Sequence, residues 1–179
     1  MSYSLDLTLR AFYHLTSSTT LMNHTPEIRL ALPSDAEKIT AVINAAFRIV
    51  EEFFIDGNRI TLEEVQQSFG RGAFLVACDG DALSGCVYVE PRGERAYLGL
   101  LSVDPARQQK GLGSRLMRAA EEYGREQGAR FMDIYIVNLR TDLPPFYRQR
   151  GYSENGTTPF PPDVPTKQPC HFINMSKSL

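Results

Sequence analysis

The sequence has no tryptophan, only three cysteines and no long apolar run, and each shortage excludes a class of protein. A membrane-spanning helix needs about 20 consecutive apolar residues, and no segment provides them. Cys78, Cys86 and Cys170 lack the spacing of a metal site, and two of them lie in apolar runs. This pattern favours free thiols in a reducing compartment. We therefore expect a cytoplasmic protein with no metal ion and no membrane contact.

A strongly basic surface is also lacking. The formal net charge is −2 over 179 residues, with 19 basic and 21 acidic side chains. Binding to a phosphate backbone requires a concentrated positive surface, so nucleic acid is not the expected partner. The length suits one domain, large enough to bury a core without metal or disulfide support.

The N-terminal segment shows no periodic pattern. Residues 1–25 mix short apolar pieces with Ser and Thr and lack the basic start and apolar centre of a signal peptide. We interpret them as a poorly ordered extension of unassigned role that precedes a domain at 26–179. Met22 lies just before the first strand-like run and is a candidate alternative start.

Alternating and helical periodicities predict an α/β domain with a mixed sheet and helices on both faces. Strands are expected at 27–31, 73–78, 83–90, 96–103, 130–137 and 171–175. Helices are expected from about 34 to 47, from a capping box at Thr61, at 113–127 and at 142–149. Short connections containing Gly and Asp indicate antiparallel hairpins among the second, third and fourth strands.

The most informative segment joins the fourth strand to the next helix. The strand ends at Asp104-Pro105, and Gly111 and Gly113 stand where the helix begins. Glycines leave amide N–H groups uncovered, and together with the helix dipole these groups form a site for an anion such as a diphosphate. A P-loop would need a lysine after Gly113, and a dinucleotide fingerprint would need glycine at Leu116. Neither nucleotide motif is present.

The pattern Gln108-x-x-Gly111-x-Gly113 after Val103-Asp104-Pro105 resembles the acetyl-CoA motif of the Gcn5-related N-acetyltransferases (the GNAT family). Residues 145–152, Pro-Phe-Tyr-Arg-Gln-Arg-Gly-Tyr, are similar to that family's second motif, and the resemblance covers about 27–177. It implies a single GNAT domain whose mostly antiparallel sheet is splayed at the fourth and fifth strands. It also implies acetyl-CoA as cosubstrate, an amine of a small molecule or peptide as acceptor, and direct transfer; a homodimer stays open.

The resemblance assigns cofactor contacts position by position. The splayed strand would pair with the pantetheine arm, the loop amides would bind the pyrophosphate, and an asparagine past the fifth strand would bond the cofactor. Lys110 either touches a phosphate or lies in solvent. The residues concerned are Leu101, Ser102, Val103, Gln108, Gln109, Lys110, Gly111, Leu112, Gly113, Ser114 and Asn138.

Tyr147 matches the family's proton donor to the departing CoA sulfur, with aromatic packing as the alternative. The fourth strand holds no carboxylate that could act as the base. Glu51, Glu52 and Asp56 border the implied acceptor site and could hold a cationic amine, or could be solvated acids. Further candidates for the base are Asp133, Tyr135, His171 and a water chain, so no base is named.

The acceptor cannot be identified from the sequence. Segments 48–60 and 157–167 should shape its pocket, and small amines, amino acids, antibiotics and protein N-termini all stay open. A different class of function is a CoA-binding sensor or structural module without catalysis, against which the presence of Tyr147 argues.

We expect a chain that begins at Met22 to fold as the full chain does, because residues 1–21 precede the first periodic element. Its melting temperature should stay within a few degrees of the full-length value in a thermal denaturation experiment. Loss of solubility or of a cooperative transition would instead show that the segment packs on the domain.

Overall fold

A computed structural model describes residues 25–55, 57–107, 111–162 and 164–179. One seven-stranded sheet has the order β1-β2-β3-β4-β5-β7-β6, and only the β4–β5 pair is parallel. The strands are β1 Glu27–Leu30, β2 Ala73–Asp79, β3 Ala82–Arg92, β4 Arg95–Val103, β5 Phe131–Val137, β6 Ser153–Pro159 and β7 His171–Ser178. The helices are α1 Ala36–Glu51, α2 Leu62–Ser68, α3 Leu112–Glu126 and α4 Leu143–Arg148. This is the mixed α/β fold expected from the sequence.

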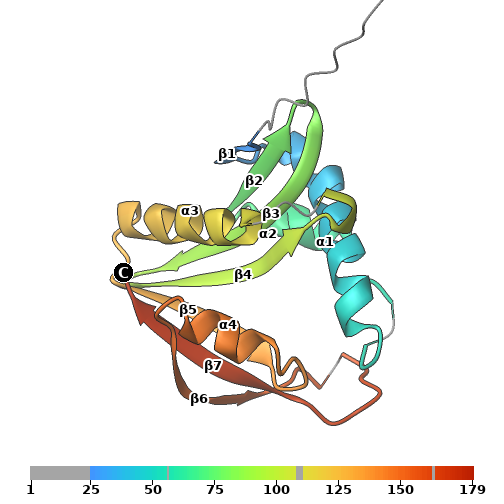
Figure 1. Cartoon of the computed structure of the whole chain (residues 1–179), viewed down its shortest axis with the longest axis vertical. Coiled ribbons are helices and arrows are strands. Elements are labelled where there is room, and N and C mark those ends of the chain that lie inside the picture. The colour runs from blue at the N-terminus through green and yellow to red at the C-terminus, as the bar shows by residue number, and fades with distance from the viewer. Residues whose placement is uncertain (1–24, 56, 108–110, 163) are drawn as a thin grey trace, which may run out of the picture.

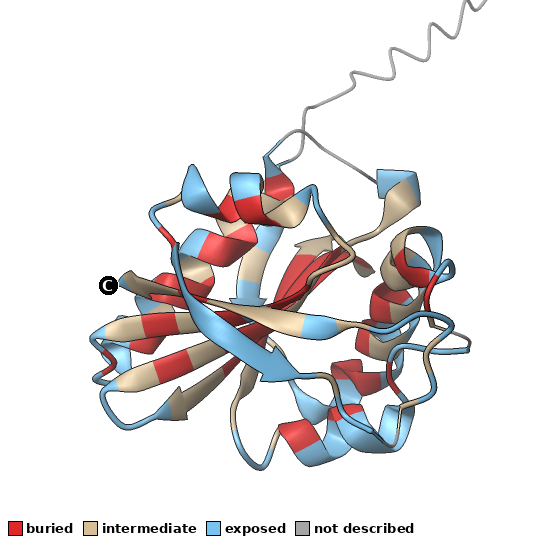
Figure 2. Cartoon of the chain, turned by 90° about the horizontal axis from the view of Figure 1, so that it is seen from below, coloured by how far each residue is buried: buried red, intermediate tan, exposed pale blue. Residues whose placement is uncertain are grey.

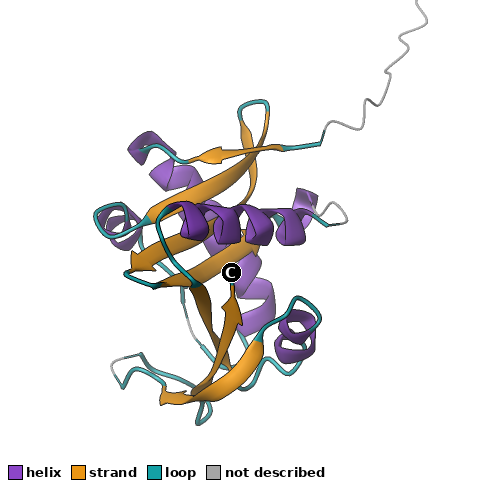
Figure 3. Cartoon of the chain, turned by 90° about the vertical axis from the view of Figure 1, so that its left-hand side faces the viewer, coloured by secondary structure: helices purple, strands orange, loops and turns teal. Residues whose placement is uncertain are grey.

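Helices cover both faces of the sheet (Figure 3). On one face, α1 and α2 bury Ile39, Ile43 and Val65 against residues of β2 and β3. On the other face, α3 packs Leu116 and Ala120 on the centre of the sheet, and α4 adds the ring of Tyr147. Among the helices of the described residues, none combines the length and the apolar character needed to cross a membrane.

The structure confirms two helix boundaries that the sequence predicts, the start of α2 and the end of α3. Thr61 and Glu64 form the predicted capping box: the Glu64 N–H donates to the Thr61 hydroxyl at 3.2 Å, and the Thr61 N–H donates to Glu64 at 2.7 Å. Gly128 ends the α3 segment at a φ of +87°, a conformation that favours glycine. The first helix begins later than the expected position of about 34, because a 3₁₀ turn at Pro33–Asp35 precedes α1.

The sequence did not predict β6. Its residues are Ser-Glu-Asn-Gly-Thr-Thr-Pro, all exposed, so the alternation that marks a half-buried strand is missing. This strand is pale blue along its length in Figure 2. It exists because its backbone pairs with the edge of β7, from Ser153↔Ser176 to Pro159↔His171.

The pairing between β4 and β5 is short. It includes only Arg95↔Phe131, Ala96↔Met132 and Tyr97↔Asp133, after which the strands separate (Figure 1). The paired end is fixed by the Arg95 guanidinium, which donates to both oxygens of Asp133 and, at 2.7 Å, to the Ser176 hydroxyl. The expected splay between the fourth and fifth strands is therefore present.

A bulge lies in β4 where the separation begins. Between the pairs Cys86↔Ser102 and Tyr88↔Gly99, β4 contains one residue more than β3. Leu100 has a φ of +52°, and it is the one non-glycine residue with positive φ among those described. Such strain of about 1 kcal/mol or more persists where surrounding packing enforces it, and it clusters at functional sites.

A buried polar cluster joins α3 to β7. Glu121 is buried on α3, where it accepts hydrogen bonds from the Tyr152 hydroxyl at 3.1 Å and from Lys177 Nζ at 2.7 Å. The Tyr152 ring contacts the Tyr147 ring edge-on, with centroids 5.6 Å apart. The cluster thus supports the residue to which the sequence assigns catalysis.

We expect Glu121→Ala to destabilise the protein by about 3 kcal/mol, because it leaves a largely buried ammonium group without its partner. Urea unfolding followed by circular dichroism would measure the loss. Glu122→Ala, an exposed change on the same helix, is the matched control and should cost little. Equal effects of the two substitutions would show that the cluster contributes nothing specific.

Candidate functional site

A cavity of about 450 Å³ lies between the separated strands, and we call it the splay cavity. Its volume is in the range of small-molecule sites. It is lined by Ala46, Phe47, Ile49, Val50, Glu51, Arg59, 97–103, Pro105, Gly113, 134–137, Arg140, Leu143, Phe146, Tyr147 and Phe172. Six helices and strands, α1, β4, α3, β5, α4 and β7, therefore contribute to one site.

The β4 side of the cavity contains the three residues expected to meet a pantetheine arm. Leu101, Ser102 and Val103 all line it, beyond the last β4–β5 pair. Their segment still pairs with β3, so only the side facing β5 lacks a neighbouring strand. An extended chain with amide groups could pair with that side as a missing strand would. The pantetheine contact itself stays a prediction.

The N-terminus of α3 meets the same cavity through Gly113. Gly111 precedes the helix at a φ of +89°, and no side chain of the described residues caps it. The first intrahelical bond runs from the Arg115 N–H to the Gly111 carbonyl at 3.0 Å. The N–H groups of Leu112, Gly113 and Ser114 therefore have no acceptor within the helix and suit an anion. Gln108, Gln109 and Lys110 lie outside the described residues.

Arg150 adds a positive charge at this helix end, and the sequence analysis did not identify it. Its Nη2 donates to the Ser114 hydroxyl at 2.8 Å, and its Nη1 donates to the Phe146 carbonyl, also at 2.8 Å. The guanidinium lies 3.5 Å from the Phe146 ring centroid. Arg150 occupies a variable position of the second motif, so nothing in the motif itself indicated a role.

Tyr147 lines the cavity with only 7% of its surface exposed. Its ring meets Phe146 edge-on at 5.1 Å, and burial raises the pKa of its hydroxyl to about 12, with smaller lowering effects from Arg140 and Arg150. The phenol therefore stays protonated throughout the neutral range and can donate a hydrogen bond. Phe146 is less buried than Tyr147, and both rings line the cavity.

Asn138 follows β5 as expected, but part of its side chain is engaged. Its Oδ1 accepts a hydrogen bond from the His171 N–H at 2.9 Å, and its own N–H donates to the His171 carbonyl at 3.0 Å. These bonds tie the end of β5 to the start of β7. A cofactor contact through the remaining amide NH₂ stays a prediction.

The two candidates for the base on β5, Asp133 and Tyr135, lie in different surroundings. Asp133 lies at the closed end, where burial alone would raise the pKa of its carboxyl but bonds from Arg95 and Ser176 hold that pKa below its ordinary value. It does not line the cavity. Tyr135 does line it and stacks on Tyr97 with centroids 5.3 Å apart.

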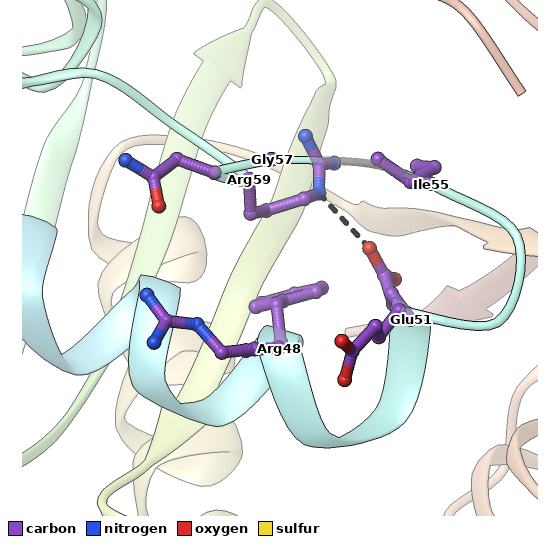
Figure 4. Close-up of a pocket in the computed structure, with 8 residues that line it drawn as sticks. Arg48, Glu51, Ile55, Gly57 and Arg59 are labelled. Carbon is purple, nitrogen blue, oxygen red and sulfur yellow. Dashed lines mark ion pairs between the residues drawn. The ribbon is translucent and has the colours of Figure 1, made fainter.

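A second hollow of about 240 Å³, the loop pocket, adjoins the splay cavity at the end of α1 (Figure 4). Phe47, Glu51 and Arg59 line both. The loop pocket is lined by Phe47, Arg48, Glu51, Glu52, Ile55, Gly57, Asn58 and Arg59. Two of the predicted acceptor-site acids, Glu51 and Glu52, therefore lie at a cavity, whereas Asp56 is outside the described residues.

Glu51 is the acid that faces both hollows. Burial raises the pKa of its carboxyl, and the charges of Arg59 and Arg140 partly offset that effect. Figure 4 shows the ion pair in which Arg59 Nε lies 3.7 Å from Glu51 Oε2. The sequence did not indicate either arginine, because a single loop arginine that lines a cavity cannot be distinguished in sequence from one exposed to solvent.

No metal site is evident in the part of the chain that the structure describes: no three His, Cys, Asp or Glu side chains gather there at ligand distance. The three cysteines are unpaired thiols.

The model of the acetyltransferase (GNAT) family matches residues 43–152, which include both motifs and most of the cavity. The chain belongs to the GNAT family. As an N-acetyltransferase of this family it has a curated relative in the streptothricin acetyltransferase of Streptomyces lavendulae. The two are 27% identical over 163 residues, covering 75% of this chain and 85% of the relative.

Solved structures agree on the fold of this GNAT protein. The PaiA N-acetyltransferase of Thermoplasma acidophilum, solved with coenzyme A, has a TM-score of 0.69 at 18% identity, covering 86% of this chain and 98% of the other. The ribosomal-protein-alanine N-acetyltransferase of Brucella melitensis has a TM-score of 0.68 at 21% identity, covering 86% and 99%. Family members use acetyl-CoA, so the helix end and open strand described above are the places to test for it.

In this GNAT acetyltransferase, Gly113→Glu should weaken acetyl-CoA binding at least tenfold, or about 1.4 kcal/mol. The substitution places a negative side chain beside the uncovered amides. Position 113 is a better test than 111, because a side chain at Gly111 would also strain a backbone of positive φ. Isothermal titration calorimetry gives the affinity.

Gly113→Ala is the matched control. An added Cβ at this position would lie 3.9 Å from Val103 Cγ2, which is ordinary van der Waals contact. Affinity should therefore stay close to wild type. If the glutamate variant also bound acetyl-CoA normally, the diphosphate would have to bind elsewhere.

Proposed function

We propose that this chain transfers the acetyl group of acetyl-CoA directly to an amine. The pyrophosphate binds the N–H groups of Leu112, Gly113 and Ser114, with Arg150 beside them. The pantetheine arm extends along β4 from Val103 toward Leu101. The thioester then lies in the splay cavity within reach of Tyr147.

The observation that carries this proposal is the convergence of three features on one cavity. Gly113 at the α3 N-terminus, the β4 side without a strand partner, and the Tyr147 ring all line it. An anion site, an extended groove and a proton donor in that order match the three parts of acetyl-CoA: diphosphate, pantetheine and thioester. The family membership of the chain supports the same reading.

The reaction forms one bond and breaks one. The neutral amine nitrogen attacks the thioester carbonyl carbon, the C–S bond breaks, and sulfur leaves as the CoA thiolate. Tyr147 gives its hydroxyl proton to that sulfur, while the attacking nitrogen releases one proton to solvent water. Solvent returns a proton to the phenolate. Backbone N–H groups of β4 at the thioester end of the arm stabilise the negative charge that develops on the thioester oxygen.

A CoA-binding module without catalysis is the competing function. Its cofactor affinity could equal that of an enzyme, so binding alone does not separate the two. Incubation with acetyl-CoA and a panel of amines, with free thiol followed continuously, does separate them. Amine-dependent thiol release supports the transferase, and saturable binding without any release contradicts it.

Tyr147→Phe should lower kcat by roughly 10²-fold or more with little change in KM, because general-acid contributions of ~10²–10⁴ act in the transition state. The ring packing is kept, so the melting temperature should hold. Since burial raises the pKa of Tyr147 to about 12, the wild-type rate should show no limb from this group below roughly pH 10. Steady-state kinetics over pH measures both.

Tyr123→Phe removes a hydroxyl from a tyrosine on α3 that does not line the cavity, and serves as the control. It should leave kcat unchanged. A Tyr147→Phe enzyme with wild-type kcat would leave Tyr147 as a packing residue and make solvent the proton source.

A further inference from the structure

Among its described residues, the acceptor end of the site is lined by more positive than negative charge. Across the splay cavity and the loop pocket, the described charged residues are Arg48, Arg59 and Arg140 against Glu51 and Glu52. In the splay cavity alone, two arginines face one glutamate. A pocket for an acceptor whose charges are all positive would be expected to show the opposite balance.

Glu51 is the buried acid of the two hollows, and its carboxylate accepts no hydrogen bond from the described residues. Its side chain is nine-tenths buried, with 10% exposed. The Arg59 Nε at 3.7 Å makes an ion pair longer than a hydrogen bond, and no hydrogen bond to the carboxylate is found among the described residues. A buried carboxylate without such hydrogen bonds can accept them from a ligand in the cavity. An ammonium group supplies up to three N–H donors.

Arg59 has spare donors at the mouth of both hollows. Its Nε is the nitrogen that approaches Glu51, and its guanidinium lies 5.3 Å from the Phe47 ring centroid. The two contacts fix the orientation of the guanidinium while both Nη groups remain without a hydrogen-bond partner among the described side chains. A guanidinium held in this way suits a carboxylate or a similar oxyanion.

Arg140 extends the positive wall toward the thioester end. Its Nε and Nη2 donate to Asp142 at 3.0 and 2.8 Å, which leaves Nη1 free of that pair. The arginine side chain is only 14% exposed whereas its partner is 64% exposed, so the carboxylate lies at the surface and the guanidinium at the cavity. Arg140, Glu51 and Tyr147 all line the splay cavity, and the charge of Arg140 lowers the pKa of both other groups, so the acceptor end and Tyr147 are neighbours.

We propose that the acceptor is a small amine that also carries an anionic group, of which a free α-amino acid is the simplest form. Glu51 binds the amino group in its ammonium form, and Arg59 with Arg140 binds the carboxylate or an equivalent oxyanion. The ammonium group gives one proton to solvent before the neutral nitrogen attacks the thioester. The loop pocket then receives the remainder of the molecule. This assignment rests on the proposed acetyl transfer. It disfavours a peptide N-terminus, in which the neighbouring carboxyl group is a neutral amide.

The test compares acceptors that differ only in that charge. L-amino acids with small, aliphatic, aromatic and acidic side chains are assayed beside their own carboxamides, with streptothricin as a further acceptor. Thiol release from acetyl-CoA gives kcat and KM for each. The wild-type kcat/KM should favour at least one acid over its amide by tenfold or more.

Two variants locate the source of that preference. Arg59→Gln and Arg140→Gln should each reduce the acid-to-amide ratio at least fivefold, mainly through a higher KM for the acid, while the KM of the amide changes little. Arg125→Gln makes the same charge change at an exposed site in the last turn of α3, and its ratio should equal that of the wild type. Melting temperatures confirm that each variant is folded, and the two arginine variants test the same point independently.

The contrary outcomes are distinct. One outcome is that amides or streptothricin react as well as the best acid. Another is that the arginine variants slow acid and amide equally. Either would overturn the anionic acceptor but not the acetyl transfer. No thiol release with any acceptor, by an enzyme that still binds acetyl-CoA, would overturn the proposed function and this inference with it.

Discussion

The site depends on the early end of hydrogen bonding between β4 and β5. Three residue pairs hold the strands together, and Arg95 fixes that end through Asp133 and Ser176. Beyond Tyr97 the strands diverge, and the bulge at Leu100 lies in the diverging segment of β4. Backbone groups without partners inside a protein are costly, so an unpaired strand side within a cavity is stable only if water or a ligand satisfies it. The paired end and the separated end of β4 and β5 therefore depend on each other. Without the contacts of Arg95 at the paired end, the two strands could close together or slide past one another.

Arg150 connects the N-terminus of α3, the proposed anion site, to α4, which contains the proposed proton donor Tyr147. It bonds the Ser114 hydroxyl at the α3 N-terminus and the Phe146 carbonyl in α4, one residue before Tyr147. The Glu121 cluster also joins α3 to α4, farther along α3, through Tyr152, whose ring contacts Tyr147. The position of the tyrosine relative to the helix end is therefore fixed on two sides. A proton donor must reach a sulfur whose place is set by how the diphosphate is bound, so rigidity between these two points is what the chemistry requires.

The fold was more predictable from the sequence than the site was. Apolar alternation predicted the central strands, and the Thr61 capping box and Gly128 marked helix ends correctly, because these signals act locally. The exposed strand β6 was missed, since only its pairing with β7 makes it extended. Gly113 and Tyr147 belonged to motifs and could be singled out. Arg59, Arg140 and Arg150 could not, because their importance comes from the cavity walls and partners that distant segments provide. The three-dimensional arrangement also pairs Glu51 with Arg59, which changes the interpretation of the acidic cluster.

The high pKa of Tyr147 is compatible with proton donation only if its partner is buried as well. A thiol has an ordinary pKa of about 8.5, so a phenol near 12 would keep its proton beside a solvated thiolate. In the proposed reaction, however, the leaving sulfur forms inside the same cavity, and the burial that disfavours a phenolate disfavours a thiolate too. What decides the transfer is the difference between the two acidities. Arg140 and Arg150 lower the pKa of Tyr147, because both stabilise its phenolate form. An arginine that binds the acceptor's anion would also make the tyrosine a better acid, which couples recognition of the acceptor to departure of the thiolate.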